Sequence, residues 1–422
     1  MKIAIIGSGI SGLGSSLILK DHHDVHLFES NTRWGGHAHT SDIKTYNGDQ
    51  VALDTGFLVY NELTYPHLTA LFKYLNVETV DSDMSLSIRS QRDQVEWAGD
   101  NLSTVFAQKK NLFRPSFYKM LFQILKFHRK APAYREECQN ESLNLEEFLD
   151  RHGYGQEIRE WYILPMVAAI WSTGEKDMLK FPAETFFNFF LNHKLLQVND
   201  RPIWRTVKNG SRNYVQKIIS QLPKKSLGEA VVSVRNSAEG IQIQTTRDTY
   251  HFDKVIFATS APIALGLIQN PTQPQKNILG SFRTTPNQAY LHTDSYLMPK
   301  NQKCWASWNV LAKGLDQNNQ VSLTYYLNRL QPLQTTDQLL LTLNCDTKPE
   351  GLLMQASYEH PEMNRAAIEA QKKLDEIQGV ENMYFCGAWA RYGFHEDGLL
   401  SAVCVAKKIG AEPPWSNLIQ SK

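Results

Sequence analysis

The chain begins with a short apolar run that leads directly into a glycine-rich turn. The run, Ile3–Ile6, has the length and character of a strand buried on both faces of a parallel sheet. After the turn, Leu13 and Leu17 begin an apolar stripe with helical spacing, and the segments 26–29 and 51–53 predict two further short strands. This succession of strand, turn, helix and strand predicts an α/β fold with a parallel sheet.

Later segments return to the same sheet and are separated by two insertions. Residues 231–259 alternate as a β-meander and end in the apolar run Val255–Phe257, and residues 384–406 predict a strand, a loop and a helix. The insertion near 86–200 is mostly helical and aromatic. The insertion near 266–375 predicts the strands 289–292, 305–308, 321–326 and 339–343.

The predicted architecture is therefore α/β, with two domains built from alternating pieces of the chain. A Rossmann-like nucleotide-binding domain, with a parallel sheet plus the β-meander, comprises residues 1–85, 201–265 and 376–422. A discontinuous α+β substrate domain containing an antiparallel sheet comprises residues 86–200 and 266–375. The length of 422 residues also favours two domains.

One helix in the first insertion has an unusual polar face. Pro115 suits a helix start and Pro132 a helix end, and Lys109–Lys130 forms the basic part of the segment. Between residues 101 and 135 there are eight Lys or Arg and no Asp or Glu. Two interpretations stay open: a core helix with a solvated polar face, or an interfacial helix on anionic lipid. Its apolar positions are Phe117, Tyr118, Met120, Leu121, Phe122, Ile124, Leu125 and Phe127.

Composition narrows the class of protein. A formal net charge of +1 gives no reason to expect a nucleic-acid partner. The five cysteines are scattered without a CxxC pair, which suits a reducing compartment and argues against a disulfide framework. No leader pattern and no apolar run near the ~20 residues of a membrane helix are visible. We therefore expect a cytoplasmic protein, with peripheral contact to the inner face of the membrane left open.

The glycine turn carries the first candidate chemistry. Gly7 permits a tight turn, Gly9 permits close approach to a pyrophosphate, and Gly12 permits close packing of helix on strand. The helix N-terminus that follows favours an anion. Glu29 lies 17 residues beyond Gly12 and predicts a ribose contact, with Ser11 beside the turn. An acid at this place repels a 2′-phosphate, so the pattern disfavours NADP.

The order of four motifs identifies the cofactor class by resemblance. GxGxxG, Glu29, Arg33-Trp-Gly-Gly36 and Asp54-Thr-Gly56 together resemble the flavin-binding domain of the amine oxidase and phytoene desaturase superfamily. The resemblance implies FAD and places the adenine on the first meander strand. It also implies that the flavin and its ribityl chain lie over a helix N-terminus after Gly387, where Ala388 stands in place of the usual acid. The further cofactor residues that it implies are Ser30, Arg33, Gly35, Gly36, Thr55, Gly56, Val231, Val232, Asp397, Gly398 and Leu399.

Several longer stretches resemble one bacterial branch of that superfamily. They include DTGFLVYNELTYP (54–66), FFLNHKLLQV (189–198) and GAWARYGFHEDGL (387–399). The branch consists of NAD/FAD-binding oxidoreductases associated with cyclopropane-fatty-acid-synthase-like enzymes, and it includes the flavin desaturase of methyl-branched fatty acyl chains in furan fatty acid formation. The resemblance implies desaturation of an acyl chain by hydride transfer to flavin N5, with a methyltransferase of that kind as a pathway partner.

Four residues are candidates for the base that such a reaction uses. His395 and Glu396 lie in the loop expected to reach the flavin, and Tyr392 and His193 are further candidates. The pair of histidines at 37 and 39 supplies too few ligands for a metal, so no metal site is predicted. Phenylalanines of 181–193 either line a substrate channel or form core. A flavin amine oxidase for a soluble amine and a non-catalytic lipid- or partner-binding flavoprotein remain alternatives.

Overall fold

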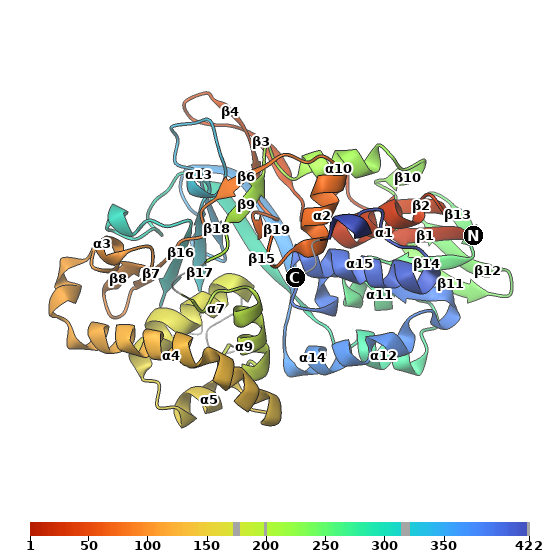
Figure 1. The fold of residues 1–422 in the computed structure, drawn as a ribbon. Coiled ribbons are helices and arrows are strands. Elements are labelled where there is room, and N and C mark those ends of the chain that lie inside the picture. Colours follow the sequence, from red (N-terminus) through yellow and green to blue (C-terminus); the bar gives the residue numbers. More distant parts are fainter. Residues whose placement is uncertain (172–177, 198–200, 314–320, 420–422) are drawn as a thin grey trace.

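The computed structural model describes residues 1–171, 178–197, 201–313 and 321–419. Figure 1 shows two regions side by side: a parallel sheet with its helices on the right, and a mixed sheet with a group of helices on the left. The predicted α/β class, with a parallel sheet, a β-meander and a second region containing antiparallel strands, is confirmed.

The parallel sheet has the strand order β10-β2-β1-β14-β20 and separates two layers of the first region. Along β1, Ile3 and Ile5 belong to the core shared with α1 and α15, whereas Ala4 and Ile6 belong to a second core on the opposite face. This alternation explains why the N-terminal run is apolar at every position. The elements are β1 (Lys2–Ile6), β2 (Asp24–Glu29), β10 (Lys224–Leu227), β14 (Lys254–Phe257), β20 (Met383–Phe385), α1 (Ile10–Leu19) and α15 (His395–Ile409).

The second core of this region lies under the meander and three helices. Its members come from residues 268–282 and 367–377 as well as from the meander. The domain boundaries predicted at 266 and 375 stay a prediction, although packing associates these two stretches with the parallel sheet. The elements are β11 (Val231–Ser237), β12 (Gly240–Thr245), β13 (Thr249–Phe252), α11 (Ala261–Leu267), α12 (Gln273–Leu279) and α14 (Arg365–Lys372).

The mixed sheet joins strands from both insertions in the order β19-β15-β18-β17-β16-β7-β8. All neighbours are antiparallel except β16 and β7, which are parallel. The strand predicted at 305–308 begins only at Trp308. The elements are β7 (Leu86–Ser90), β8 (Val95–Ala98), β15 (Thr284–His292), β16 (Trp308–Ala312), β17 (Ser322–Tyr326), β18 (Leu340–Leu343) and β19 (Leu352–Pro361).

The helices of the first insertion pack around a phenylalanine core. Phe127, Phe148, Phe186 and Phe187 are fully buried and contact one another, so these positions are core. The predicted end of the basic helix at Pro132 is wrong, because α4 continues through it to Asn140. Pro132 lies on the exposed side, whereas the buried stripe continues beyond it, so tertiary packing outweighs the lost hydrogen bond. The helices are α4 (Pro115–Asn140), α5 (Leu145–Arg151), α6 (Gln156–Ile158), α7 (Leu164–Trp171) and α9 (Ala183–Asn192).

Short elements connect the two regions. A hairpin of β3 and β4 follows the first flavin-type motifs, and a small sheet of order β5-β9-β6 lies beside α2. None of the described helices is long and apolar enough to cross a membrane. The remaining elements are β3 (Thr40–Lys44), β4 (Gln50–Asp54), β5 (Tyr60–Asn61), β6 (Thr79–Ser82), β9 (Trp204–Val207), α2 (Pro66–Tyr74), α3 (Leu102–Val105), α10 (Arg212–Ile219) and α13 (Leu327–Leu330).

Truncating Phe187 tests the phenylalanine core. We expect Phe187→Ala to lower the free energy of unfolding by about 3–5 kcal/mol, because it leaves a cavity among packed rings. The same change at Phe122, which is 71% exposed on α4, should alter that free energy by less than about 0.5 kcal/mol. Urea unfolding of both variants measures the difference. Equal losses at the two positions would contradict the packing described.

Candidate functional site

The glycine turn leaves open space at one of its three glycines. Gly7 has a φ of +100°, and a Cβ at Gly12 would lie 1.8 Å from the Gly7 carbonyl oxygen. At Gly9, in contrast, a Cβ would meet no atom within 4 Å. Gly9 is also the N-cap of α1, and no side chain caps the helix there. The first turn of α1 therefore presents free N–H groups to unfilled space, which suits a pyrophosphate.

Glu29, at the end of β2, is fixed beside this turn. Its Oε2 accepts hydrogen bonds from the backbone N–H and the hydroxyl of Ser8, at 2.9 and 2.6 Å. Its Oε1 accepts from the backbone N–H of Asn31 at 2.9 Å and from the Ser30 hydroxyl at 3.4 Å. The Ser30 contact is the longest, so it is the one that a ribose hydroxyl would replace most easily.

The loop at residues 33–36 covers the glycine turn. The Gly35 N–H donates to the Ser8 carbonyl oxygen at 3.1 Å, and a Cβ at Gly36 would lie 2.9 Å from the Gly9 Cα. Arg33 is half-buried, donates to the Ala38 carbonyl oxygen at 3.4 Å, and has no carboxylate within ion-pair distance in the described part of the chain. Burial lowers its pKa. A half-buried cation without an anionic partner suits the phosphates of a dinucleotide.

The C-terminal loop closes the same site from the other end of the chain. The Ser11 hydroxyl donates to the Gly398 carbonyl oxygen at 2.9 Å, and a Cβ at Gly398 would lie 2.8 Å from Ile10 Cγ2. Asp397 Oδ2 accepts from the Phe394 N–H at 3.0 Å, and burial raises the pKa of Asp397 to about 6. Gly398 and Leu399 thus lie against α1, and the Gly387 N–H donates to the Ser401 hydroxyl of α15 at 2.9 Å.

The other predicted cofactor residues take different places. The Thr55 hydroxyl lies 2.6 Å from the Tyr358 hydroxyl, and a Cβ at Gly56 would lie 2.1 Å from the His37 carbonyl oxygen. Val231 is half-buried at the start of β11, close to the end of β2, and Val232 is 47% exposed. Contact of these residues with a cofactor stays a prediction.

His395 and Glu396 are adjacent in sequence but have different surroundings. The His395 ring stacks on Phe57 at 3.9 Å, and its Nε2 lies 2.8 Å from the Tyr214 hydroxyl. Burial lowers the pKa of His395 to about 3. Both Glu396 oxygens accept backbone N–H groups of His67 and Leu68 at 2.9 Å, so Glu396 caps α2. Burial raises the pKa of Glu396 to about 7.

His193 and Tyr392 belong to a separate aromatic group around Phe189. Ring centroids of His193, Phe394 and Tyr392 lie 4.3, 4.9 and 5.7 Å from that of Phe189. His193 is buried, and burial lowers its pKa to about 4. Of the four predicted bases, Glu396 accepts two backbone N–H groups at the start of α2, and the assignment of any of the four as the base stays a prediction.

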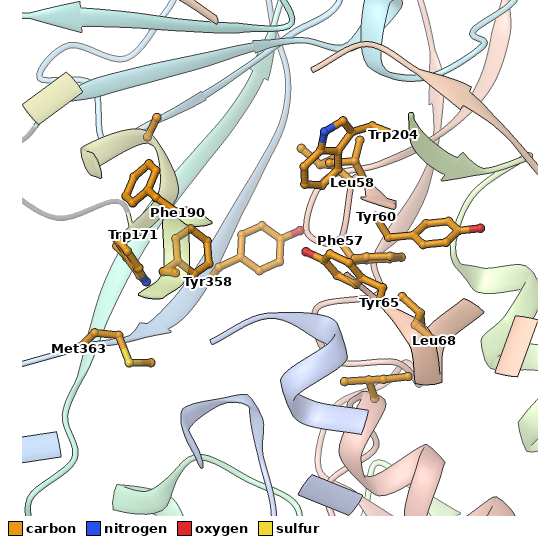
Figure 2. Packing of buried hydrophobic residues seen from close by; sticks show 14 of the residues in the cluster. Phe57, Leu58, Tyr60, Tyr65, Leu68, Trp171, Phe190, Trp204, Tyr358 and Met363 are labelled. Atoms are coloured by element: carbon orange, nitrogen blue, oxygen red, sulfur yellow. The ribbon is translucent and has the colours of Figure 1, made fainter. Parts of the chain in front are cut away.

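Tyr358 of β19 links the two regions, and no sequence motif pointed to it. Its hydroxyl lies 2.6 Å from Thr55 Oγ1 and 2.8 Å from His39 Nδ1. Figure 2 shows Tyr358 between Trp171 and Phe190 on one side and Phe57 on the other. A tyrosine from the mixed sheet therefore completes a hydrogen-bond chain in the cofactor region.

His37 faces accessible space within the same cluster. Its ring lies 5.5 Å from Tyr358 and 5.7 Å from His360, and its charge also bears on His395. The side chain is exposed to accessible space, and desolvation by the surrounding protein lowers the pKa of the ring. The histidine pair after Gly36 was the available sequence signal. Within the described residues, no three His, Cys, Asp or Glu side chains form a metal site.

Comparisons with known proteins point to one family. The model of flavin containing amine oxidoreductases matches residues 10–337. A search of the curated proteins found no match. Solved structures with the same fold include a CLA-producing fatty acid isomerase from P. acnes, with a TM-score of 0.70, 11% identity and coverage of 97% of this chain and 98% of that one.

Two amine oxidases have the same fold at comparable similarity. Cyclohexylamine oxidase from Brevibacterium oxydans IH-35A gives a TM-score of 0.68 at 13% identity, covering 97% of this chain and 99% of that one. Putrescine oxidase bound to putrescine gives 0.67 at 14% identity, with the same coverage. At these identities the likeness shows the fold.

Filling the space at Gly9 tests the cofactor site. We expect Gly9→Val to fold but to retain less FAD, because its side chain would occupy the open space that Gly9 borders. Gly266→Val is the matched control, because a Cβ there also meets nothing within 4 Å and Gly266 is exposed on α11. Flavin absorbance per protein, with circular dichroism as the folding check, measures the effect. Full flavin content in Gly9→Val would refute the placement.

Proposed function

The chain belongs to the flavin containing amine oxidoreductase family and is an FAD-dependent oxidoreductase, and we propose that it desaturates a fatty acyl chain. The substrate that we propose is a methyl-branched unsaturated acyl group of a phospholipid. A methyltransferase similar to cyclopropane fatty acid synthase would supply the branch. The observation that carries the proposal is the apolar, partly accessible face of the mixed sheet that extends from Tyr358.

This face is built from residues that lie opposite one another in the sheet. Along β19, Met354, Ala356 and Tyr358 share one side, and Met354 and Ala356 are opposite Leu291 and Ala289 of β15. Met354 and Ala356 are only half-buried. The row ends at Tyr358, beside His37 and His39, and offers accessible apolar surface that an alkyl chain can cover.

The same face continues toward the far edge of the sheet. Trp308 of β16 and Leu86 of β7 are paired in register and are both half-buried. The two acids of the C-terminal loop, Glu396 and Asp397, bind backbone N–H groups. An ammonium group would find no free carboxylate from this pair, which favours an acyl chain over an amine.

When bound, FAD would supply the hydride acceptor. For a desaturation, the protein would then need only to orient the substrate and accept a proton. The substrate C–H pair is lost as a hydride and a proton, and the two carbons gain a double bond. The apolar face would hold the alkyl chain and exclude water. A base must then lie beside the accessible space.

We assign the proton acceptor to His37 rather than to His395. The His37 ring interacts with the Glu359 backbone, so one ring nitrogen is engaged and the other has its lone pair available. Its lowered pKa keeps the imidazole neutral at pH 7. His395 instead has Nε2 beside Tyr214 and its ring face on Phe57. We therefore place proton acceptance at His37, the more exposed histidine of the two.

Anaerobic mixing tests the substrate class. We expect phospholipids with methyl-branched unsaturated chains to bleach the flavin absorbance and to lose two hydrogens by mass spectrometry. Saturated straight-chain phospholipids are the control. They lack an activated allylic C–H bond and should not bleach the flavin. Bleaching by cyclohexylamine or putrescine, with none by the lipids, would identify an amine oxidase. Flavin that no substrate of either class reduces would favour the non-catalytic alternative.

Replacing His37 tests the base. We expect His37→Ala to slow lipid-dependent flavin reduction by about 100-fold or more while FAD content is retained. His22→Ala, at an exposed position in the turn after α1, is the matched control. Because the pKa of His37 is lowered, the wild-type rate should be constant above pH 6.5 and fall only on acidification below it. A wild-type rate in His37→Ala would exclude the assignment.

A further inference from the structure

Helix α4 is apolar on two faces. Its inner stripe, which includes Phe117, Met120 and Phe127, is buried against α6 and α9. On the opposite side, Phe122 and Leu125 are 71% and 54% exposed. A helix of a water-soluble protein normally has one apolar stripe, so the inner packing does not explain the outer one.

The exposed apolar surface extends beyond the helix. Phe113, immediately before α4, is 88% exposed, and Leu102 of α3 is 78% exposed. Tyr118 connects these parts, because its hydroxyl donates to the Leu112 carbonyl oxygen at 3.1 Å and its ring lies 5.8 Å from that of Phe106. We define the α4 surface as Leu102, Leu112, Phe113, Tyr118, Phe122 and Leu125.

Exposed cations surround the α4 surface. Five of them make no ion pair with a carboxylate of the described residues, in contrast to Lys119, which pairs with Glu157 at 3.1 Å. No Asp or Glu occurs between residues 101 and 135. Like charges are therefore concentrated without local compensation. The five cations are Lys109, Lys110, Lys126, Arg129 and Lys130.

We propose that the α4 surface docks the protein onto an anionic phospholipid bilayer. Phe113, Phe122 and Leu125 would enter the boundary between headgroups and acyl chains, and the surrounding cations would contact anionic headgroups. This is peripheral docking by one face of a helix that itself lies in the interface. It rests on this surface alone and holds whatever the substrate is.

Charge argues against a second copy of the chain as the occupant. In a two-fold dimer the same surface faces itself, so the unpaired cations of one copy would lie near those of the other. A bilayer that contains phosphatidylglycerol or phosphatidylserine has the opposite charge and an apolar interior. It therefore matches both properties of the α4 surface.

Vesicle sedimentation of the purified FAD-loaded protein tests the proposal. We expect the protein to bind phosphatidylcholine vesicles with 30–50% phosphatidylglycerol at low salt about tenfold or more tightly than pure phosphatidylcholine vesicles. High salt should weaken this binding. Phe113→Ser with Phe122→Ser, and separately Lys109→Glu with Lys126→Glu, should each lower the affinity about tenfold or more.

Ile263→Ser is the control variant, since Ile263 is 50% exposed on α11, away from the α4 surface. It should bind as the wild type does, and all variants should keep their flavin content and melting temperature. Wild-type protein that does not bind anionic vesicles, or variants that bind equally well, would overturn the proposal. So would a wild-type dimer that the phenylalanine variant converts to monomer without any vesicle binding.

Discussion

The contact between the start of α1 and the start of α15 is the constraint on which the rest of the molecule depends. Ser11 and Gly398 are 387 residues apart and share a hydrogen bond, and a side chain at Gly398 would collide with Ile10. Gly14 allows the same two helices to approach at Leu399 and Ala402. Because Ser11 and Gly398 form parts of one site, the segments between them must run away from the parallel sheet and back to it. This explains why the second region consists of two insertions.

The N-terminal cofactor motif and the meander were predictable, because each depends on residues that are close together in the sequence. The apolar run, the glycine turn and Glu29 lie in one short N-terminal stretch, and the meander repeats the period of a strand. The helix end at Pro132 was not predictable in the same way. The buried stripe of α4, which contacts α9, continues through the proline, and no local pattern reveals that tertiary support.

The candidate site shows the same division between local and distant information. Glu396 looks like a base in sequence, but its partners are N–H groups of α2, more than 300 residues earlier in the chain. Tyr358 could not be assigned, because β19 reaches the cofactor region only through the register of the mixed sheet. His37 was visible as half of a histidine pair. Its proposed role depends on its exposed position beside Tyr358, and that position is a property of the folded chain alone.

The position of the Tyr358 hydroxyl has a mechanical consequence. Its two partners, Thr55 and His39, belong to the region of the parallel sheet, whereas Tyr358 belongs to the mixed sheet. Separating the two regions would break these hydrogen bonds, together with those that Gln331 makes to the Asp54 backbone, and would leave polar groups unpaired at a cost of roughly 1–3 kcal/mol each. Tyr358 thus opposes separation of the two regions. Motions that keep its two hydrogen bonds intact cost less free energy than motions that break them.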